Sequence, residues 1–111
     1  MGFSLMYTCD NWVIIKFKGD DPHYRVLTGT SGSYLSGSYW RMNSGIVKIE
    51  EDSDYYLVYG ASGSVYRCHK HSYFLRTNNV YVWKQLQEQH GDKVEIVDVD
   101  TDWLTFDWII T

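Results

Sequence analysis

Hydrophobic and polar positions alternate along much of the chain, and a period of two residues is typical of β strands. Within residues 11–18, Val13 and Ile15 share one face, while Trp12 and Ile14 share the other. Later segments repeat this kind of pattern and are separated by turn-forming residues. They are HYRVLTG (23–29), GIVKIEED (45–52), YYLVYG (55–60) and SVYRCHK (64–70). The alternation predicts a mainly β protein.

The segment TNNVYVWKQLQEQHG departs from this alternation. Val80, Trp83 and Leu86 fall at helical spacing, and Gly91 suits the position just past the end of a helix. These features predict one helix near residues 78–90. After it, KVEIVDV and DWLTFDWII flank a short DTD turn, which predicts a C-terminal β-hairpin.

Two glycine-serine segments, YRVLTGTSGSY (24–34) and YYLVYGASGSV (55–65), are close copies of each other. A phosphate-binding loop requires a lysine and a following helix, and both segments lack these features. A nucleophile elbow also leads from a strand into a helix, whereas these segments lead into further strand. Glycine and serine are ordinary turn residues. The copies therefore predict two related β-hairpin units.

These elements predict one domain over residues 1–111, because a chain of this length supports a single core. Its class is mainly β, a β-rich α+β fold. We expect a strongly curved antiparallel sheet or small barrel built from the two hairpin units. The single helix would cover at most one face of this one-layer sheet, which leaves the other face partly open.

Aromatic residues make up 17% of the chain, which excludes a disordered protein and exceeds what one small core can hide. A membrane span needs about 20 consecutive apolar residues, and the apolar runs here are far shorter. The N-terminal residues also lack the features of a signal peptide. We therefore expect a cytoplasmic protein without a membrane segment, in which Cys9 and Cys68 are free thiols.

The sequence CHKH contains the candidate metal ligands Cys68, His69 and His71, and Cys9 could supply a fourth. Neighbouring residues of a strand point to opposite faces, so Cys68 and His69 would not share one site. The acidic segment DVDTD lacks the glycine and glutamate that a calcium-binding EF-hand loop needs. No pair of acid-base or nucleophilic residues stands out, so we predict neither a cofactor nor an enzyme.

Residues 55–87 contain no acidic residue, and aromatic side chains alternate there with basic ones. Small β-barrels bind single-stranded nucleic acid by stacking bases on such aromatic residues. The candidates for this alternative function are Tyr66, Arg67, Lys70 and Tyr73. A net charge of −4 argues against it, because phosphate binding depends on positive charge.

Recognition of another protein is the function that we expect first, since Tyr, Trp and Arg dominate the energetics of protein interfaces. The candidate residues lie in or beside the repeated hairpins. They are Trp40, Arg41, Tyr66, Arg67, Tyr73 and Arg76. The simplest form of this hypothesis is a homodimer.

Four stretches of the chain, DDPHYRVLTG, SYWRMNSGI, YRCHKHSY and HGDKVEIV with the later TDWLTFDWII, carry a resemblance. Together they are similar to small uncharacterised proteins of marine cyanophages. The resemblance covers most of the chain and implies a phage protein made in the host cytoplasm. It also implies that the partner is a host protein, but it assigns no role to any particular residue.

Overall fold

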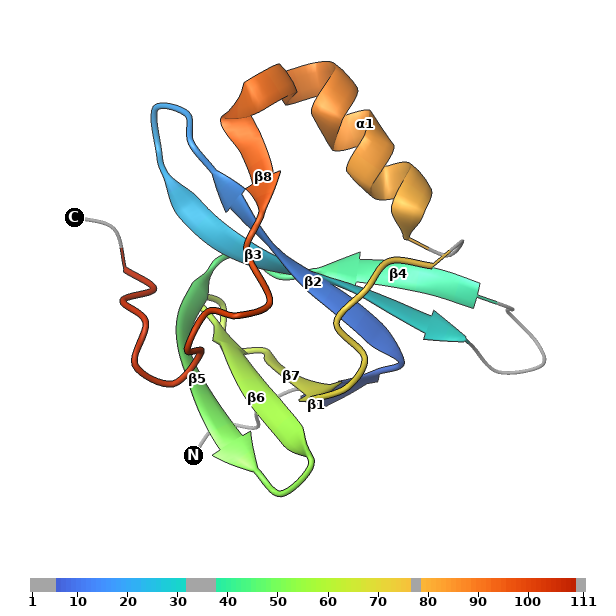
Figure 1. The fold of residues 1–111 in the computed structure, drawn as a ribbon, viewed down its shortest axis with the longest axis vertical. Coiled ribbons are helices and arrows are strands. Elements are labelled where there is room, and N and C mark those ends of the chain that lie inside the picture. Colours follow the sequence, from blue (N-terminus) through green and yellow to red (C-terminus); the bar gives the residue numbers. More distant parts are fainter. Residues whose placement is uncertain (1–5, 32–37, 77–78, 110–111) are drawn as a thin grey trace.

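The computed structural model describes residues 6–31, 38–76 and 79–109, which form eight strands in two four-stranded sheets and one α helix (Figure 1). Sheet A contains, in spatial order, β1 (Met6–Cys9), β7 (Val65–His69), β6 (Tyr55–Gly60) and β5 (Ile46–Asp52). Sheet B contains β4 (Ser38–Met42), β3 (His23–Ser31), β2 (Asn11–Phe17) and β8 (Val94–Ile96). The helix α1 (Val80–His90) continues into a 3₁₀ turn, η1 (Gly91–Lys93).

Strand β2 is buried on both faces and is shared by two hydrophobic clusters. Trp12 and Ile14 face the cluster between the two sheets. Val13 and Ile15 face a second cluster between sheet B and α1. The predicted alternation of β2 is therefore confirmed. Because β2 has apolar residues on both sides, sheet B forms the layer between sheet A and α1.

Two sheets replace the predicted single curved sheet, and in the described residues they do not close into a barrel. The chain passes directly from β1 in sheet A to β2 in sheet B. It changes sheets again between β4 and β5, where Gly45 adopts a φ of 151° that favours glycine. The face of sheet B that was expected to be open instead packs against sheet A. The expectation of a one-layer sheet was wrong.

The two glycine-serine copies do form hairpins, but they lie in different sheets. The first copy contributes to the antiparallel pair β3 and β4, and the second to the antiparallel pair β6 and β7. The mainly β class is thus confirmed, while the copies pack across the inter-sheet core instead of side by side in one sheet.

The predicted helix is present at residues 80–90 and covers the side of sheet B that faces away from sheet A (Figure 1). Val82 is buried there, and Trp83 and Leu86 pack against the same cluster. Gly91 follows the helix with a φ of 58°, as expected for a glycine at this position. The described part of the chain contains no helix with the length and apolar character needed to cross a membrane.

The predicted C-terminal hairpin is wrong. Strand β8 pairs with β2, and the described residues 97–109 contain no strand. Asp102 starts a turn instead, because its side chain accepts a hydrogen bond from the Leu104 N–H at 3.2 Å. This turn lets Trp103 and Trp108 stack at 5.9 Å between ring centroids and close the inter-sheet core. Burial of two indole rings thus outweighs the pairing of a last strand.

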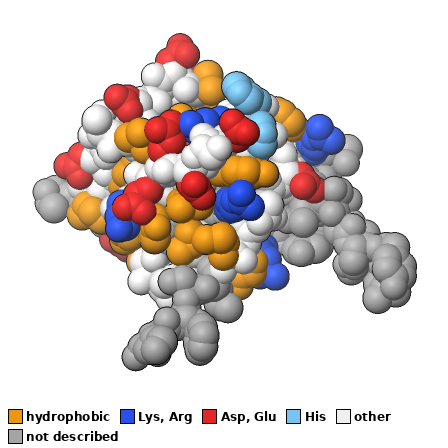
Figure 2. Space-filling model, turned by 90° about the horizontal axis from the view of Figure 1, so that it is seen from below, with side chains coloured by type: hydrophobic (Ala, Val, Ile, Leu, Met, Phe, Trp, Pro, Cys, Tyr) orange, Lys and Arg blue, Asp and Glu red, His pale blue; other side chains and the backbone are white. Residues whose placement is uncertain are grey.

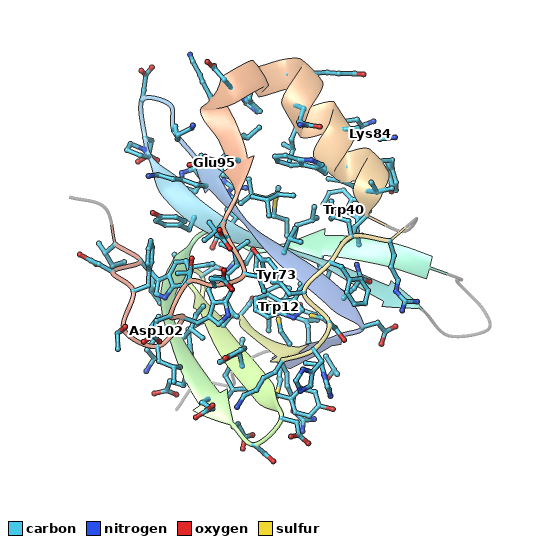
Figure 3. All side chains as sticks on the ribbon, in the orientation of Figure 1. Trp12, Trp40, Tyr73, Lys84, Glu95 and Asp102 are labelled. Carbon is cyan, nitrogen blue, oxygen red and sulfur yellow. The ribbon has the colours of Figure 1, made fainter. Side chains whose placement is uncertain are left out.

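Tyr73 lies beside Trp12 and links β2 to the C-terminal segment (Figure 3). Its ring meets the Trp12 indole edge to face, with 4.7 Å between centroids. The Tyr73 hydroxyl accepts a hydrogen bond from the Ile14 N–H at 3.1 Å and donates one to the Val97 carbonyl at 2.5 Å. Burial raises the pKa of Tyr73 to about 12.

We predict that Tyr73→Phe weakens the dependence of stability on alkaline pH. A tyrosine whose pKa is raised in the folded state contributes stability that is complete below the pKa of the unfolded chain and is lost as pH rises. Between about pH 8 and pH 11, the wild type should lose about 1 kcal/mol more unfolding free energy than Tyr73→Phe. Urea unfolding at both pH values measures this difference. Tyr81→Phe, at a half-exposed position on α1, is the control and should behave like the wild type.

Candidate functional site

The main-chain N–H groups of the second glycine-serine loop donate hydrogen bonds to other atoms of the protein. The Gly60 N–H donates to the Ser64 carbonyl at 2.8 Å, and the Gly63 N–H donates to the Gly60 carbonyl at 3.0 Å. The N–H groups of Ala61 and Ser62 also donate to protein atoms. These groups do not converge on an empty site, as phosphate binding would require. The corresponding part of the first loop, residues 32–37, lies outside the described residues.

The candidate metal ligands Cys68, His69 and His71 do not converge. Cys68 points into the inter-sheet core, whereas the His69 ring packs against the neighbouring rings of Tyr55 and His71. Across the described ranges, no group of three or more His, Cys, Asp or Glu residues is arranged to hold a metal ion.

Of the six residues predicted to bind a partner, Tyr66 is buried and Tyr73 is partly buried. Tyr66 is only 4% exposed, because it alternates with Arg67 on β7 and points into the core. Tyr73 is occupied by its contacts with Trp12 and by its two hydrogen bonds. Tyr66 is therefore inaccessible to a partner, which contradicts its choice as a binding residue, and most of the Tyr73 side chain is already in contact with the core.

The other four residues are distributed over different parts of the surface. Trp40 is 38% exposed on β4 beside the start of α1 (Figure 3). Arg76 lies over the Phe74 ring, with 5.1 Å from guanidinium carbon to centroid. Arg41 packs over the Tyr7 ring at 4.1 Å. Arg67 lies on β7, in sheet A, whereas Trp40 and Arg41 lie on β4, in sheet B. The structure therefore does not bring the six residues together in one site.

Arg67 belongs to a continuous surface, the side of sheet A that faces away from the core, which we call the outer face. Its residues follow from the strand register, since every second residue of a strand points to the same side. The outer face comprises Met6 and Thr8 of β1, Arg67 and His69 of β7, Tyr55, Leu57 and Tyr59 of β6, and Lys48, Glu50 and Asp52 of β5. Val65 points to the same side but is only 3% exposed.

The middle of the outer face is apolar and aromatic, while its border on β5 is charged. Across the sheet, Thr8, Arg67, Leu57 and Glu50 form one row of register partners. Leu57 is thus flanked by a cation on one side and an anion on the other. Protein interfaces commonly combine such an apolar centre with a polar rim.

Cations and tyrosine rings hold each other in place on this surface. The Arg67 guanidinium lies over the Tyr55 ring at 3.8 Å from carbon to centroid, and the Lys48 ammonium lies over the Tyr59 ring at 4.5 Å. Each contact lowers the mobility of a long side chain. The outer face is therefore ordered before any partner binds.

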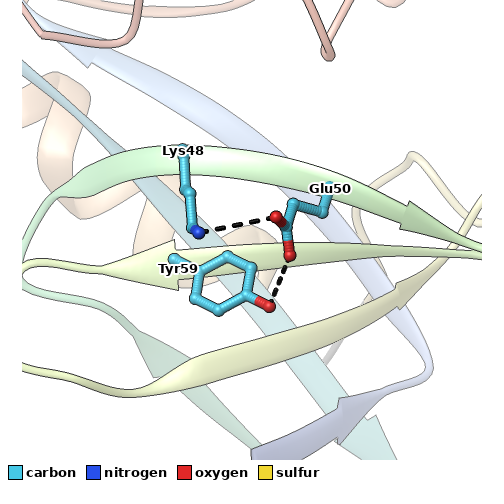
Figure 4. A network of polar contacts seen from close by, with 3 residues as sticks. All are labelled: Lys48, Glu50 and Tyr59. Carbon is cyan, nitrogen blue, oxygen red and sulfur yellow. Dashed lines mark hydrogen bonds and ion pairs between the residues drawn. The ribbon is translucent and has the colours of Figure 1, made fainter.

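Glu50 completes this arrangement by contacting both Lys48 and Tyr59 (Figure 4). The Tyr59 hydroxyl donates to a Glu50 carboxylate oxygen at 2.7 Å, and the Lys48 ammonium lies 3.4 Å from the other oxygen. The hydrogen bond from Tyr59, aided by Lys48, lowers the pKa of Glu50. The same hydrogen bond raises the pKa of Tyr59. At neutral pH the carboxylate is thus charged and the phenol is neutral.

The four residues of the nucleic-acid alternative do not form a stacking platform. Tyr66 is buried, Tyr73 is partly buried against Trp12, and Lys70 forms an ion pair with Glu51. Arg67 alone lies on the outer face, where strand β6 separates it from the acidic border of β5. Hydrophobic, acidic and basic side chains also alternate on the surface viewed from below in Figure 2. The described surface thus differs from the single-signed basic surface that binds phosphates.

Sequence reasoning missed the tyrosines and the leucine of β6, although the pattern YYLVY contains the signal. Tyr55, Leu57 and Tyr59 occupy alternate positions and so had to share one face. The sequence did not indicate which face was outward. Comparison with protein-family models, with curated proteins and with solved structures gave no match to this chain.

We predict that Arg67 and Tyr66, although adjacent in sequence, differ strongly in their effect on stability. Arg67→Ala should change the free energy of unfolding by less than about 1 kcal/mol, because it removes a surface cation–π contact. Tyr66→Ala should lower it by about 3 kcal/mol or more, because it opens a cavity in the core. Urea unfolding followed by tryptophan fluorescence measures both values. Similar losses for the two variants would contradict the assignment of faces.

Proposed function

We propose that the protein is a small non-catalytic binding protein that recognises a host protein through the outer face of sheet A. The observation that carries this proposal is the arrangement around Arg67. Its guanidinium rests on Tyr55, next to Leu57, and among the described residues it forms no ion pair. An ordered cation beside apolar side chains is a common anchor of protein interfaces.

The charges around Leu57 define the chemistry of the partner. Arg67 favours a carboxylate on the partner. On β5, about two strands away, Glu50 is already paired with Lys48, so Asp52 is the acidic residue that favours a basic group. An apolar side chain between these two charges would pack on Leu57. The partner surface that fits is therefore a protein surface with an apolar anchor between an acidic and a basic residue.

A nucleic acid fits this surface less well than a protein. Every nucleotide carries a negative phosphate, so a bound strand would meet the carboxylates of Glu50 and Asp52 as well as the cation of Arg67. Short single-stranded DNA and RNA remain the probes for this alternative in a mobility-shift assay. Binding that weakens with salt and is lost in Arg67→Glu would contradict protein recognition as the primary function.

A phage origin, which the resemblance of the sequence stretches implies, is the reason for choosing a host protein as partner. We propose that the protein acts in the cytoplasm of the host, where cyanobacterial proteins are the available partners. A cyanobacterial lysate is accordingly the source from which a partner should be sought.

We predict that Arg67→Glu abolishes capture of a specific protein from this lysate. The tagged wild type should retain that protein, and Arg67→Glu should retain at least tenfold less, because the new carboxylate repels the acidic group of the partner. Lys84→Glu is the control, since it makes the same charge change at an exposed site on α1, on the side of sheet B that faces away from sheet A, and its capture should equal that of the wild type.

The captured protein should then be purified and its affinity measured by calorimetry with the same three proteins. Equal affinities for the wild type and Arg67→Glu would show that the outer face is not the binding surface. Self-association is tested separately by sedimentation of the wild type at several concentrations. A dimer that Arg67→Glu dissociates would assign the outer face to a second copy of this chain and overturn the proposal of a host partner.

A further inference from the structure

Cys9 and Cys68 face each other across the parallel pair of β1 and β7. They are direct register partners, and both are buried, with 3% and 0% of their surface exposed. Side chains of register partners point to the same side of a sheet, and neighbouring strands lie about 4.8 Å apart. This spacing falls within the Cα separations of roughly 4.4–6.8 Å that a disulfide bridges.

The two thiols have different environments. Contact with Cys68, followed by contact with Thr28, lowers the pKa of Cys9 despite its burial. Burial raises the pKa of Cys68 well above its ordinary value. The two nearby charges oppose each other, because Asp10 raises the pKa of Cys9 and Arg41 lowers it. Cys9 is thus the better nucleophile of the pair, and Cys68 is suited to react second.

Strand β1 also provides a route for a reagent to reach Cys9. It is a four-residue strand at the edge of sheet A, its single strand neighbour in the sheet is β7, and Met6 at its start is 55% exposed. Short edge strands open locally at a lower free energy than central ones. Such an opening exposes Cys9 while β7 stays paired with β6.

We propose that Cys9 and Cys68 form a reversible dithiol site that reacts with low-molecular-weight disulfides, such as oxidised glutathione, and closes into an intramolecular disulfide between β1 and β7. The Cys9 thiolate attacks one sulfur of the reagent, which forms a mixed disulfide and releases one thiol. Cys68 then loses its proton and attacks the Cys9 sulfur, which releases the second thiol. One reagent disulfide is reduced for each protein disulfide formed.

The geometry of the parallel pair favours a labile bond. Side chains of parallel partners start at about the spacing of the strands, whereas the Cβ atoms of a disulfide lie about 3.8 Å apart. Both residues must therefore lean toward each other, and a strained disulfide is more easily reduced. Closure would fasten β1 to the strand that carries Arg67, so the oxidised and reduced proteins differ at the border of the outer face.

The test is incubation of the folded protein with oxidised glutathione, followed by alkylation of remaining thiols and mass spectrometry. The wild type should lose the mass of two hydrogen atoms and yield a peptide pair linked through Cys9 and Cys68. Cys68→Ser should stop at a glutathione adduct on Cys9. Cys9→Ser should remain unmodified, because Cys68 is fully buried and then lacks the thiol that reacts first with glutathione.

Hydrogen exchange tests the same proposal on the wild-type protein, without any substitution. In the oxidised protein, the N–H groups of β1 that pair with β7 should exchange at least tenfold more slowly than in the reduced protein, because β1 no longer opens. Two free thiols that persist in the folded protein, under conditions that oxidise the urea-unfolded chain, would overturn the proposal. So would linkage without any change in the exchange of β1.

Discussion

The structure depends on burial of β2 from both sides. Trp12 and Ile14 hold the two sheets together, and Val13 and Ile15 hold α1 against sheet B. A strand that packs on both faces tolerates little displacement, because a shift of one residue would exchange its two sets of side chains. The indole N–H of Trp12 also donates to the His69 carbonyl at the end of β7, at 2.8 Å. The central strand thereby fixes the position of the strand that carries Arg67.

The packing around β2 gives the proposed binding surface a rigid support. The inner side of sheet A is committed to the core through Val58, Tyr66 and Cys68. The outer side presents Tyr55 and Arg67 in fixed contact. Side chains that are already ordered lose little entropy when a partner binds, so more of the contact energy appears as affinity. A four-stranded sheet with one committed side is well suited to this role.

Alternation along the sequence predicted the strands that contain Val13 and Tyr66, and helical spacing predicted the helix that contains Trp83. It failed where the choice between two faces depended on partners that are distant in sequence. Tyr66 and Arg67 were both plausible outward residues until sheet B covered one side of β7. The C-terminal segment was mispredicted because DWLTFDW also alternates, although Asp102 starts a turn that buries Trp103. Local patterns specify which residues share a face, but the packing of whole layers decides which face is buried.

The pairing of β1 with β7, and of β2 with β8, has a consequence for synthesis on the ribosome. The first strands to emerge receive their last partners only after residues 65–69 and 94–96 have been translated. Until then, β2 exposes apolar side chains on both of its sides, a state that is prone to aggregation. Folding of these two sheets must therefore finish late, after residues 94–96 have left the exit tunnel.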